Sequence, residues 1–388
     1  MLYSQITPIF VEVFAKQMMK ILLLGEYSNV HWTLAEGLRP LGHQVCVVSH
    51  GDFWKNYRRD ISLVRHTPGT WDGLCYLAKL LAVLPRLRGY DVVQLINPCF
   101  LELKAERIYA IYDYLRRHNG KVFLGGYGMD YYWVHTCTTT QTFRYSDFNF
   151  GTILRDSADI RREIAEWIQG EKGKLNRYIA ADCDGIPTGL YEYYACYHPH
   201  FPQKTTFIPF PINLSGLSPR KPRPEGAPVR FFIGIQRTRS EYKGTDIMLR
   251  ALERLHQAYP DRCEIVKAES VPYEEYQHLM NSSDVILDQL YSYTPAMNAL
   301  LAMAKGLVLV GGGEPENYDI IQETELRPII NVLPDEEDVY RQLEQLVLHP
   351  ERLPRLSAES RLYVERHHDH VKVAAQYIDF WTTSTNRQ

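Results

Sequence analysis

The chain has 388 residues, of which 45% are hydrophobic and 23% are charged, and its formal net charge at pH 7 is −3. This composition is close to the globular average and excludes a disordered or collagen-like chain, and at roughly 100–200 residues per domain the length predicts two domains. The balanced charge excludes a polycation that coats nucleic acid but allows a local basic pocket. The 27 tyrosines are a surplus, and their flat faces with hydrogen-bonding tips suit sugar surfaces as well as ordinary interfaces.

Cysteine usage and the opening segment indicate the compartment. The seven cysteines are scattered, odd in number and never spaced as Cys-x-x-Cys, which predicts reduced thiols in a cytoplasmic protein and no zinc site. No stretch approaches the roughly 18 consecutive apolar residues that a membrane span needs. Residues 1–18 lack the basic start and cleavage site of a signal peptide. We interpret them as an extension ahead of the fold, although their apolar side chains could form a short amphipathic anchor.

The first half of the chain predicts a doubly wound α/β domain. A short apolar strand at 20–27 is followed by a helix at 31–41, which Ser28 or Asn29 could cap, and by a strand at 43–49. This strand-loop-helix-strand order is the opening unit of a doubly wound parallel sheet. Further strands are predicted at 91–97, 121–126 and, from a weaker pattern, 177–182, with a helix at 102–118.

Two segments interrupt this pattern. Residues 129–150 are rich in aromatic side chains and threonine and show no helical period, so we predict a loop folded over a site. Residues 217–230 are rich in proline and basic side chains and predict a linker or exposed turn. Beyond them, strands at 230–235, 263–268, 284–290 and 307–312 alternate with helices at 245–259, 272–283 and 296–306, and the chain ends in a helical tail.

The expected architecture is therefore α/β, with two doubly wound Rossmann-like domains facing a central cleft. The expected boundaries are an extension at 1–18, a first domain at 19–212, a linker at 213–228, a second domain at 229–365 and a helical tail at 366–388 that could cross back to the first domain. Folds of this kind bind ligands at the carboxyl ends of their strands.

The loop after the strand at 230–235 carries the first candidate site. It begins at Gly234 and contains Arg237, Arg239 and Lys243, the last just before a helix. Backbone N–H groups at a helix N-terminus, together with arginine and lysine side chains, suit a diphosphate. A solvated basic loop is the alternative on composition alone.

Several motifs, in this order along the chain, resemble the retaining glycosyltransferases of the GT-B fold, of the glycosyltransferase family 4 or group 1 type. The most informative are Lys-Gly-x-Asp-x-x-Leu-x-Ala-Leu-x-x-Leu, which begins at Lys243, and Ala-Met-Ala-x-Gly, which begins at Ala302, about sixty residues later. Further family elements resemble Leu-Gly-His-Gln-Val (41–45), Tyr-Asp-Val-Val (90–93), Tyr-Gly-Met-Asp (127–130) and Pro-Phe-Pro-Ile-Asn (209–213). The resemblance covers nearly all of residues 19–381, and its strength lies in the order of the motifs.

The resemblance assigns the donor diphosphate to Lys243 and to an arginine of the preceding loop, for which we prefer Arg239 over Arg237. The family's Glu-x7-Glu motif, whose glutamates contact the donor sugar and the ribose, would fall on Tyr293 and Leu301, and neither is acidic. These contacts must therefore be remade or lost. The other expected donor-binding residues are Gly25, Tyr293, Asn298, Glu314 and Glu316. Gln94 and Ile96 likewise replace two histidines of the family's His-x-His strand.

The chemistry that the resemblance implies is sugar transfer from a nucleoside diphosphate, on which negative charge grows in the transition state. Lys243 and Arg239 would stabilise that charge, so we expect no metal and no other cofactor. In a retaining mechanism the leaving phosphate can accept the acceptor's proton, whereas an inverting enzyme would need a base. His31 is our first choice for that base and Asp130 our second; a solvent-facing helix residue and a loop cap are the respective alternatives.

We expect the acceptor in the first domain, with Tyr127, Asp130 and His135 as candidate contacts. The tyrosines between 191 and 197 could form a sugar platform, but their spacing fits a buried helix face better. Residues 365–370 (Glu-Arg-His-His-Asp-His) resemble a metal cluster only in composition, because nothing in the sequence around them indicates the supporting hydrogen-bond partners that a metal site needs.

The sequence thus predicts a cytoplasmic glycosyltransferase that moves a sugar from a UDP-type or GDP-type donor to a glycan or lipid-linked acceptor, as in bacterial surface polysaccharide biosynthesis, with no nucleic-acid partner. The missing glutamates keep open a non-catalytic nucleotide-sugar or glycan binding protein on the same scaffold, and an epimerase of the same fold is a third alternative. Arg86 and Arg88 beside the apolar stretch 77–84 could place the protein at the inner face of a membrane, although core packing also explains that stretch.

Overall fold

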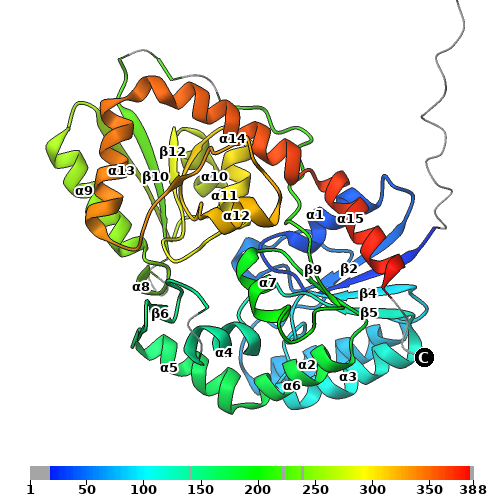
Figure 1. Cartoon of the computed structure of the whole chain (residues 1–388). Coiled ribbons are helices and arrows are strands. Elements are labelled where there is room, and N and C mark those ends of the chain that lie inside the picture. Colours follow the sequence, from blue (N-terminus) through cyan, green and yellow to red (C-terminus); the bar gives the residue numbers. More distant parts are fainter. Residues whose placement is uncertain (1–17, 140–141, 221–222, 225, 237–239, 385–388) are drawn as a thin grey trace, which may run out of the picture.

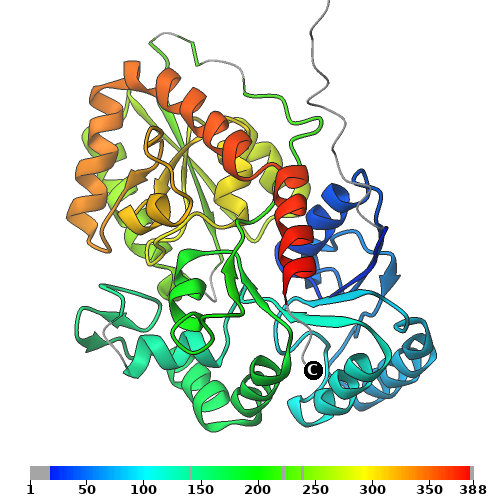
Figure 2. The same cartoon turned by 45° about the vertical axis from the view of Figure 1, so that its right-hand side comes forward.

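The computed structural model describes residues 18–139, 142–220, 223–224, 226–236 and 240–384. Figures 1 and 2 show two halves, each built around its own sheet. The sheet of the first half is parallel throughout, with the strand order β3-β2-β1-β4-β5. Its strands are β1 (Lys20–Leu24), β2 (Gln44–Ser49), β3 (Ile61–Ser62), β4 (Val92–Leu95) and β5 (Lys121–Leu124). Nearly every side chain of β1 and β4 is buried, as expected for central strands that helices cover on both faces.

Helices cover both faces of this sheet. The helices of the first half are α1 (Val30–Leu38), α2 (Thr70–Val83), α3 (Ala105–His118), α4 (Tyr131–Thr139), α5 (Ala158–Ile164), α6 (Glu171–Asp182) and α7 (Tyr191–Tyr197). In both views α1 lies on one side of the sheet and α2, α3 and α6 lie on the other. Two short strands, β8 (Ile186–Thr188) and β9 (Thr205–Phe207), continue the sheet beyond β5 through isolated bridges, and β6 (Asn149–Phe150) and β7 (Ile153–Leu154) form a separate hairpin.

The structure corrects two sequence-based assignments in this half. The predicted loop at 129–150 contains the helix α4, which begins where the Asp130 carboxylate accepts the backbone N–H of Trp133 at 2.8 Å. Because five of its nine residues are buried, α4 has no polar face and therefore no visible period. The predicted strand at 177–182 is the end of α6, in which Leu175, Asn176, Ile179 and Ala180 are buried at helical spacing.

The second half repeats the architecture, with a parallel sheet in the order β11-β10-β12-β13-β14. Its strands are β10 (Val229–Ile235), β11 (Cys263–Glu269), β12 (Val285–Leu287), β13 (Val308–Gly311) and β14 (Ile330–Asn331). Its helices are α8 (Ser240–Lys243), α9 (Thr245–Ala258), α10 (Tyr273–Asn281), α11 (Met297–Ala304), α12 (Pro315–Ile320), α13 (Glu336–Leu348) and α14 (Leu353–His367). The predicted α/β architecture of two parallel sheets is confirmed.

The last helix, α15 (His370–Thr383), packs on α1 of the first half. The Asp369 side chain caps α15 by accepting the N–H groups of Val371 and Lys372, and the backbone of Asp369 forms a bridge with Ile212, where the chain enters the second half. The two crossings between the halves therefore lie side by side. Of the helices in the described ranges, none is both long and apolar enough to cross a bilayer.

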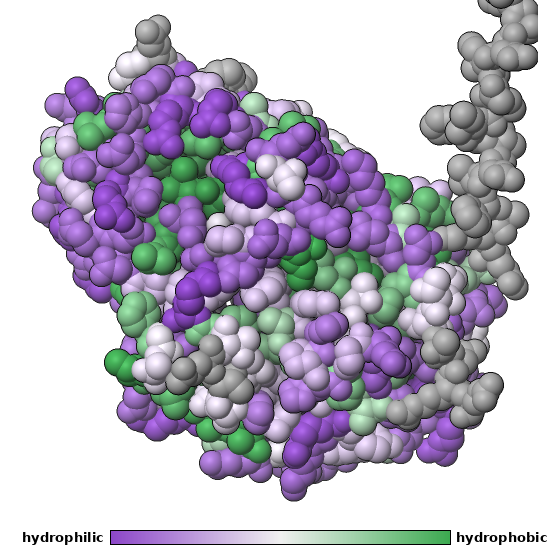
Figure 3. Space-filling model, viewed as in Figure 1, coloured by the Kyte–Doolittle hydropathy of each residue, from purple (hydrophilic) through white to green (hydrophobic). Residues whose placement is uncertain are grey.

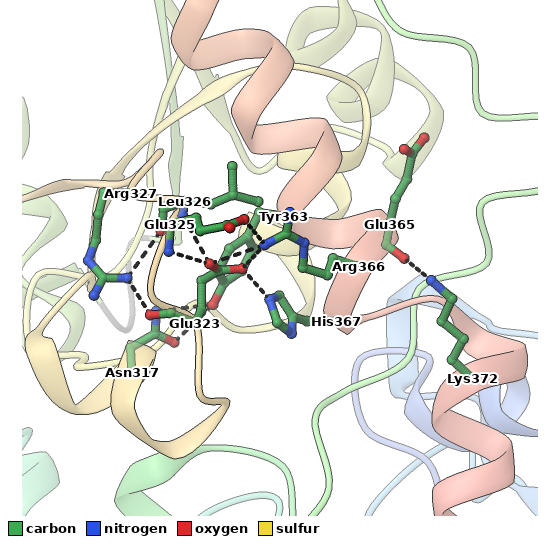
Figure 4. A network of polar contacts seen from close by, with 10 residues as sticks. All are labelled: Asn317, Glu323, Glu325, Leu326, Arg327, Tyr363, Glu365, Arg366, His367 and Lys372. Atoms are coloured by element: carbon green, nitrogen blue, oxygen red, sulfur yellow. Dashed lines mark hydrogen bonds and ion pairs between the residues drawn. The ribbon is translucent and has the colours of Figure 1, made fainter.

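A charged network holds the end of α14 to the loop after α12 (Figure 4). The Glu323 carboxylate, 3% exposed, accepts hydrogen bonds from the backbone of Glu325 (2.7 Å) and Leu326 (3.0 Å), and its other oxygen lies 2.7 Å from His367 Nε2 and 3.0 Å from Arg366. Burial opposes ionisation, but these partners more than offset it and lower the pKa of Glu323 to about 2. The network thus fixes α14 just before the chain crosses back.

We expect Glu323→Gln to lower the free energy of unfolding at pH 7 by about 2 kcal/mol, less than the full pKa shift implies because Arg366 is partly exposed. Since the folded-state pKa of Glu323 is depressed, its contribution is present above about pH 4.5 and is lost as the pH falls toward 2. Urea unfolding of both proteins at pH 7 and pH 4 checks this, because the difference between them should shrink at the lower pH. Glu325→Gln is the matched control: its side chain contacts the same Arg366 but is 73% exposed, and a loss equal to that of Glu323→Gln would contradict the prediction.

Candidate functional site

A cavity of about 1390 Å³ lies between the halves, where the carboxyl ends of both sheets face each other. Because parallel strands end at one edge of a sheet, the loops after β1, β2, β4 and β5 form one wall and those after β10, β11 and β12 form the other. The first wall includes Tyr27, Ser28, Asn29, Asp52, Phe53, Trp54, Lys55, Tyr57, Asn97, Tyr127 and Met129. The second includes Gln236, Lys243, Thr245, Ser270, Tyr273, Tyr276, Asp288, Gln289, Asn298 and Leu301.

Lys243 reaches the cavity from a corner between two helices. It ends α8, and Gly244 precedes α9 with a φ of 71°, a left-handed conformation that favours glycine. A Cβ at residue 244 would lie 2.7 Å from the Cβ of Leu290, so the corner is tightly packed. The Leu290 N–H donates to the carbonyl of Lys243 at 3.0 Å. The lysine and the N-terminus of α9 are thus held together at the cavity wall.

Asp288, directly after β12, places a carboxyl group on this wall. Burial raises its pKa, and the nearby charge of Lys243 counteracts that rise. Asn298 Nδ2 donates to Asp288 Oδ1 at 3.3 Å, and Asn298 Oδ1 accepts from the Tyr276 hydroxyl at 3.2 Å. Leu301, one helical turn after Asn298, lines the cavity beside this chain of polar groups.

The wall of the first half carries aromatic side chains and paired charges. Phe53 and Trp54 are 66% and 59% exposed, and the neighbouring Asp52 accepts from the Ser28 N–H at 2.9 Å and from Lys55 at 2.6 Å. Lys172 also lines this wall; it pairs with Glu166, and its Nζ lies 5.5 Å from the ring centroid of Trp167. Trp167 and Glu166 belong to a π-helix (Ala165–Gln169), a local distortion that is frequent at functional sites.

The loop between β1 and α1 differs from the sequence-based expectation that Ser28 or Asn29 caps the helix. Ser28 and Asn29 have positive φ and neither side chain caps α1; Glu26 does so, accepting the N–H groups of His31 at 3.2 Å and Trp32 at 2.9 Å. Glu26 is fully buried, and burial raises its pKa to about 8. Gly25 turns with a φ of 87°, and a Cβ there would lie 2.2 Å from Ile96 Cγ2. The N-terminus of α1 is therefore already occupied by the chain's own carboxyl group.

The two candidate bases lie behind the cavity wall. His31 is fully buried, its Nδ1 lies 2.8 Å from the carbonyl of Gly25, and burial lowers its pKa to about 3. Asp130 is also fully buried, accepts from Trp133 N–H and from the Tyr197 hydroxyl at 2.7 Å, and has its pKa raised by burial to about 7. Neither residue lines the cavity.

The two remaining acceptor candidates lie apart. Tyr127 lines the cavity, and its hydroxyl lies 2.5 Å from that of Tyr377 in α15. His135 stacks on Tyr131 within α4, with ring centroids 5.4 Å apart, and is not among the lining residues. The structure therefore brings Tyr127, Lys243 and Asn298 to the cavity.

Three of the residues predicted to bind the nucleotide-sugar donor instead join the two halves. Arg144 donates to Glu314 at 2.8 Å and to Glu316 at 2.5 Å, and its guanidinium lies 4.8 Å from the ring centroid of Tyr293. The Tyr145 hydroxyl also donates to Glu314. Tyr293, Glu314 and Glu316 do not line the cavity; they form a contact that we call the clasp, with Arg144 and Tyr145 on the first half.

Glu192 of α7 completes the clasp. Its carboxylate, 4% exposed, accepts from the backbone N–H groups of Tyr293 at 2.7 Å and Thr294 at 3.2 Å and from the hydroxyl groups of Ser292 and Thr294. Burial raises its pKa, and these donors counteract that rise. The loop that follows β12 is thereby fixed to the first half.

The remaining sequence-based candidates are two arginines and the histidine-rich segment at 365–370. Arg237 and Arg239 lie outside the described residues. Within the described ranges, no three His, Cys, Asp or Glu side chains come together as ligands for a metal ion, and His367 and His368 bind Glu323 and the Phe210 carbonyl respectively.

The sequence analysis missed several residues that the structure places at the site. Asp288 and Gln289 directly follow β12, so the rule that ligands gather at strand carboxyl ends would have found them. Asp52 and Trp54 follow β2 in the same way. Arg144 and Glu192 carry no such signal, because their partners lie 100 or more residues away in the sequence.

The fold, but not the sequence, is shared with known proteins. No protein-family model and no curated protein sequence matches the chain. Among solved structures, sucrose-phosphate synthase from Thermosynechococcus elongatus matches with a TM-score of 0.59 and 14% sequence identity over 94% of this chain and 98% of its own. HepE from Anabaena, in complex with UDP and glucose, matches with a TM-score of 0.57 and 11% identity over 94% and 100%.

Enzymes of a different activity share the fold too. A UDP-GlcNAc 2-epimerase from Neisseria meningitidis, bound to UDP-GlcNAc, matches with a TM-score of 0.52 and 12% identity over 93% of this chain and 99% of its own. At these identities the matches show the fold alone: two Rossmann-like domains that face a cleft, the GT-B fold.

We expect Asp130→Ala to lower the free energy of unfolding by about 2 kcal/mol, because it removes the cap of α4 and leaves the buried Tyr197 hydroxyl without its acceptor. Asp130→Asn should cost less, since an amide oxygen can still accept from Trp133. Chemical unfolding of the two variants and wild type measures these losses; an Asp130→Ala protein as stable as wild type would contradict this assignment.

Proposed function

We propose that the protein is a glycosyltransferase that uses a nucleotide-sugar donor. The observation that carries the proposal is the placement of Lys243 and the N-terminus of α9 on a cavity wall, at the carboxyl edge of the second sheet. A lysine charge and free backbone N–H groups suit a diphosphate. The GT-B neighbours that were crystallised with UDP, UDP-glucose or ADP support this class of donor.

In the proposed reaction the donor diphosphate lies against Lys243, which stabilises the negative charge that grows as the sugar leaves. Arg239, or Arg237, would add a second cation, and Asn298 and Asp288 would bind hydroxyl groups of the donor. We propose a retaining reaction without a metal ion, because the leaving phosphate can then take the acceptor's proton and no base is needed at the wall. The burial of His31 and Asp130 supports this choice over an inverting mechanism.

We further propose a glycan or lipid-linked acceptor, bound to the aromatic wall of the first half near Trp54 and Tyr127, and a role in bacterial surface polysaccharide biosynthesis at the cytoplasmic side. Aromatic faces beside carboxylates suit sugar rings, whose C–H faces are apolar and whose hydroxyl groups hydrogen-bond. Asp52 and Glu163 supply carboxylates on this wall.

A binding protein is the second candidate, and Leu301 favours it. This residue lines the cavity at the position where the related motif has a glutamate, so no carboxylate is available there for a ribose diol. A protein that binds a nucleotide sugar without turnover would show saturable binding and no release of nucleoside diphosphate. An epimerase would instead convert the donor sugar to its isomer, which chromatography of the donor pool detects.

We expect Lys243→Ala to weaken UDP binding about tenfold, the equivalent of one charge-assisted hydrogen bond, and to lower donor turnover about 100-fold. Calorimetric titration with UDP and GDP, and release of nucleoside diphosphate from a panel of UDP- and GDP-sugars, measure the two effects. Lys267→Ala is the matched control, because Lys267 lies on β11 of the same half, pairs with Glu269 and does not line the cavity. Equal nucleotide affinity and turnover in wild type and Lys243→Ala would refute the proposed site.

A further inference from the structure

Helix α2 is apolar on two opposite faces, and only one of them is packed. Tyr76, Leu80 and Val83 are 2%, 0% and 8% exposed and pack in the core of the first half. On the other face, Trp71, Leu74 and Leu81 are 75%, 55% and 56% exposed. The smaller residues between them on this outer face, Cys75, Ala78, Ala82 and the following Pro85, are exposed as well.

The spacing makes this outer face continuous. Residues 71, 74, 78, 81 and 85 follow one another at intervals of three or four, and residues 75 and 82 lie four residues after 71 and 78, so their side chains share one side of the helix. A solvated helix normally carries polar side chains on that side, whereas a helix that is apolar all round is covered on both faces. Trp71 is also the most exposed large hydrophobic side chain in the part of the chain that the structure describes. The outer face of α2 therefore has the character of a contact surface.

Basic residues border this face. Lys79 is exposed at the edge of the face, and Arg86 and Arg88 are exposed just beyond the end of α2. Asp72 is the one acidic residue of α2.

The end of α3 adds to this charge. The Gly89 N–H donates to the carbonyl of His118 at 3.0 Å, and the Tyr114 hydroxyl donates to the carbonyl of Leu84 at 3.2 Å. These bonds hold the carboxyl end of α3, with its exposed Arg117 and His118, beside Arg88. A basic cluster thus lies at one end of the apolar face.

We propose that the outer face of α2 docks the protein on an anionic lipid bilayer. Charge complementarity selects this occupant: lysine and arginine side chains at the border would meet anionic headgroups while Trp71, Leu74 and Leu81 enter the boundary with the acyl chains. Tryptophan is suited to this depth because its ring is apolar and its N–H can hydrogen-bond. The proposal concerns a surface outside the cavity and does not depend on the proposed transfer reaction.

Co-sedimentation of the full-length chain with vesicles tests it. Wild type should sediment with vesicles of phosphatidylcholine and phosphatidylglycerol, less with phosphatidylcholine alone, and less as salt is raised. The triple variant Trp71→Ser, Leu74→Ser, Leu81→Ser and the double variant Arg86→Glu, Arg88→Glu should each bind anionic vesicles at least about tenfold more weakly. The matched control is the triple variant Leu333→Ser, Leu348→Ser, Leu362→Ser, which removes exposed apolar side chains of the second half (50%, 38% and 43% exposed) and should bind like wild type.

Three outcomes would overturn the proposal. Wild type could stay in the supernatant with anionic vesicles, or the α2 variant could sediment like wild type, which would place any lipid contact elsewhere. Alternatively, sedimentation velocity could show a dimer that the α2 variant dissociates while vesicles bind neither protein, so that a second copy covers the face. UDP titration of the same variants separates this test from that of the proposed function, because nucleotide affinity should not change on loss of vesicle binding.

Discussion

The close packing of α15 on α1 is the contact on which the arrangement of the two halves depends. Gly37 of α1 lies so near to α15 that a Cβ there would be 2.1 Å from the carbonyl oxygen of His370. Only glycine allows this approach, and it brings Tyr377 and Trp381 into the core of the first half, where the Trp381 indole N–H lies 3.3 Å from Gln94 Oε1 on β4. A helix from the end of the chain is thereby built into the first half, and the carboxyl edges of the two sheets are held facing each other across the cavity.

The clasp joins the halves through both polar and aromatic contacts. Around α15 the contact is mostly apolar and close-packed, whereas the clasp combines hydrogen bonds and ion pairs from Arg144 and Glu192 with contacts between Tyr293 and the rings of Phe143 and Tyr145. In the space-filling view, the surface of the second half is mostly hydrophilic, and hydrophobic side chains gather where the halves meet (Figure 3). The halves are therefore joined by packed apolar side chains at α15 and by both polar and aromatic contacts at the clasp.

Much of the fold could be predicted from the sequence, because buried parallel strands such as β1 and β4 are continuous apolar runs and the helices between them are amphipathic. The prediction failed where that contrast disappears: α4 is buried on most sides, and the apolar end of α6 has the length of a strand. At the site, Lys243 was found from its motif and its position before a helix. The clasp could not be predicted, because Glu192 and Arg144 contact residues that lie 100 or more positions away in the sequence and come close only in the folded chain.

The two walls of the cavity are chemically unequal, and this inequality orients a ligand. In the first half, the N-terminus of α1 is taken by the Glu26 carboxyl group. In the second half, the N-cap residue of α9 is Gly244, which has no side chain that could occupy the helix N-terminus, and Lys243 lies beside it with Asp288 as its acidic neighbour. A diphosphate therefore gains more from the second wall, and a neutral, hydroxyl-rich group gains more from the aromatic first wall. Near Leu301 on this wall, the Asn298 amide donates to the Asp288 carboxyl group. Under the proposed function, these two side chains would bind the ribose in place of the glutamate that Leu301 replaces.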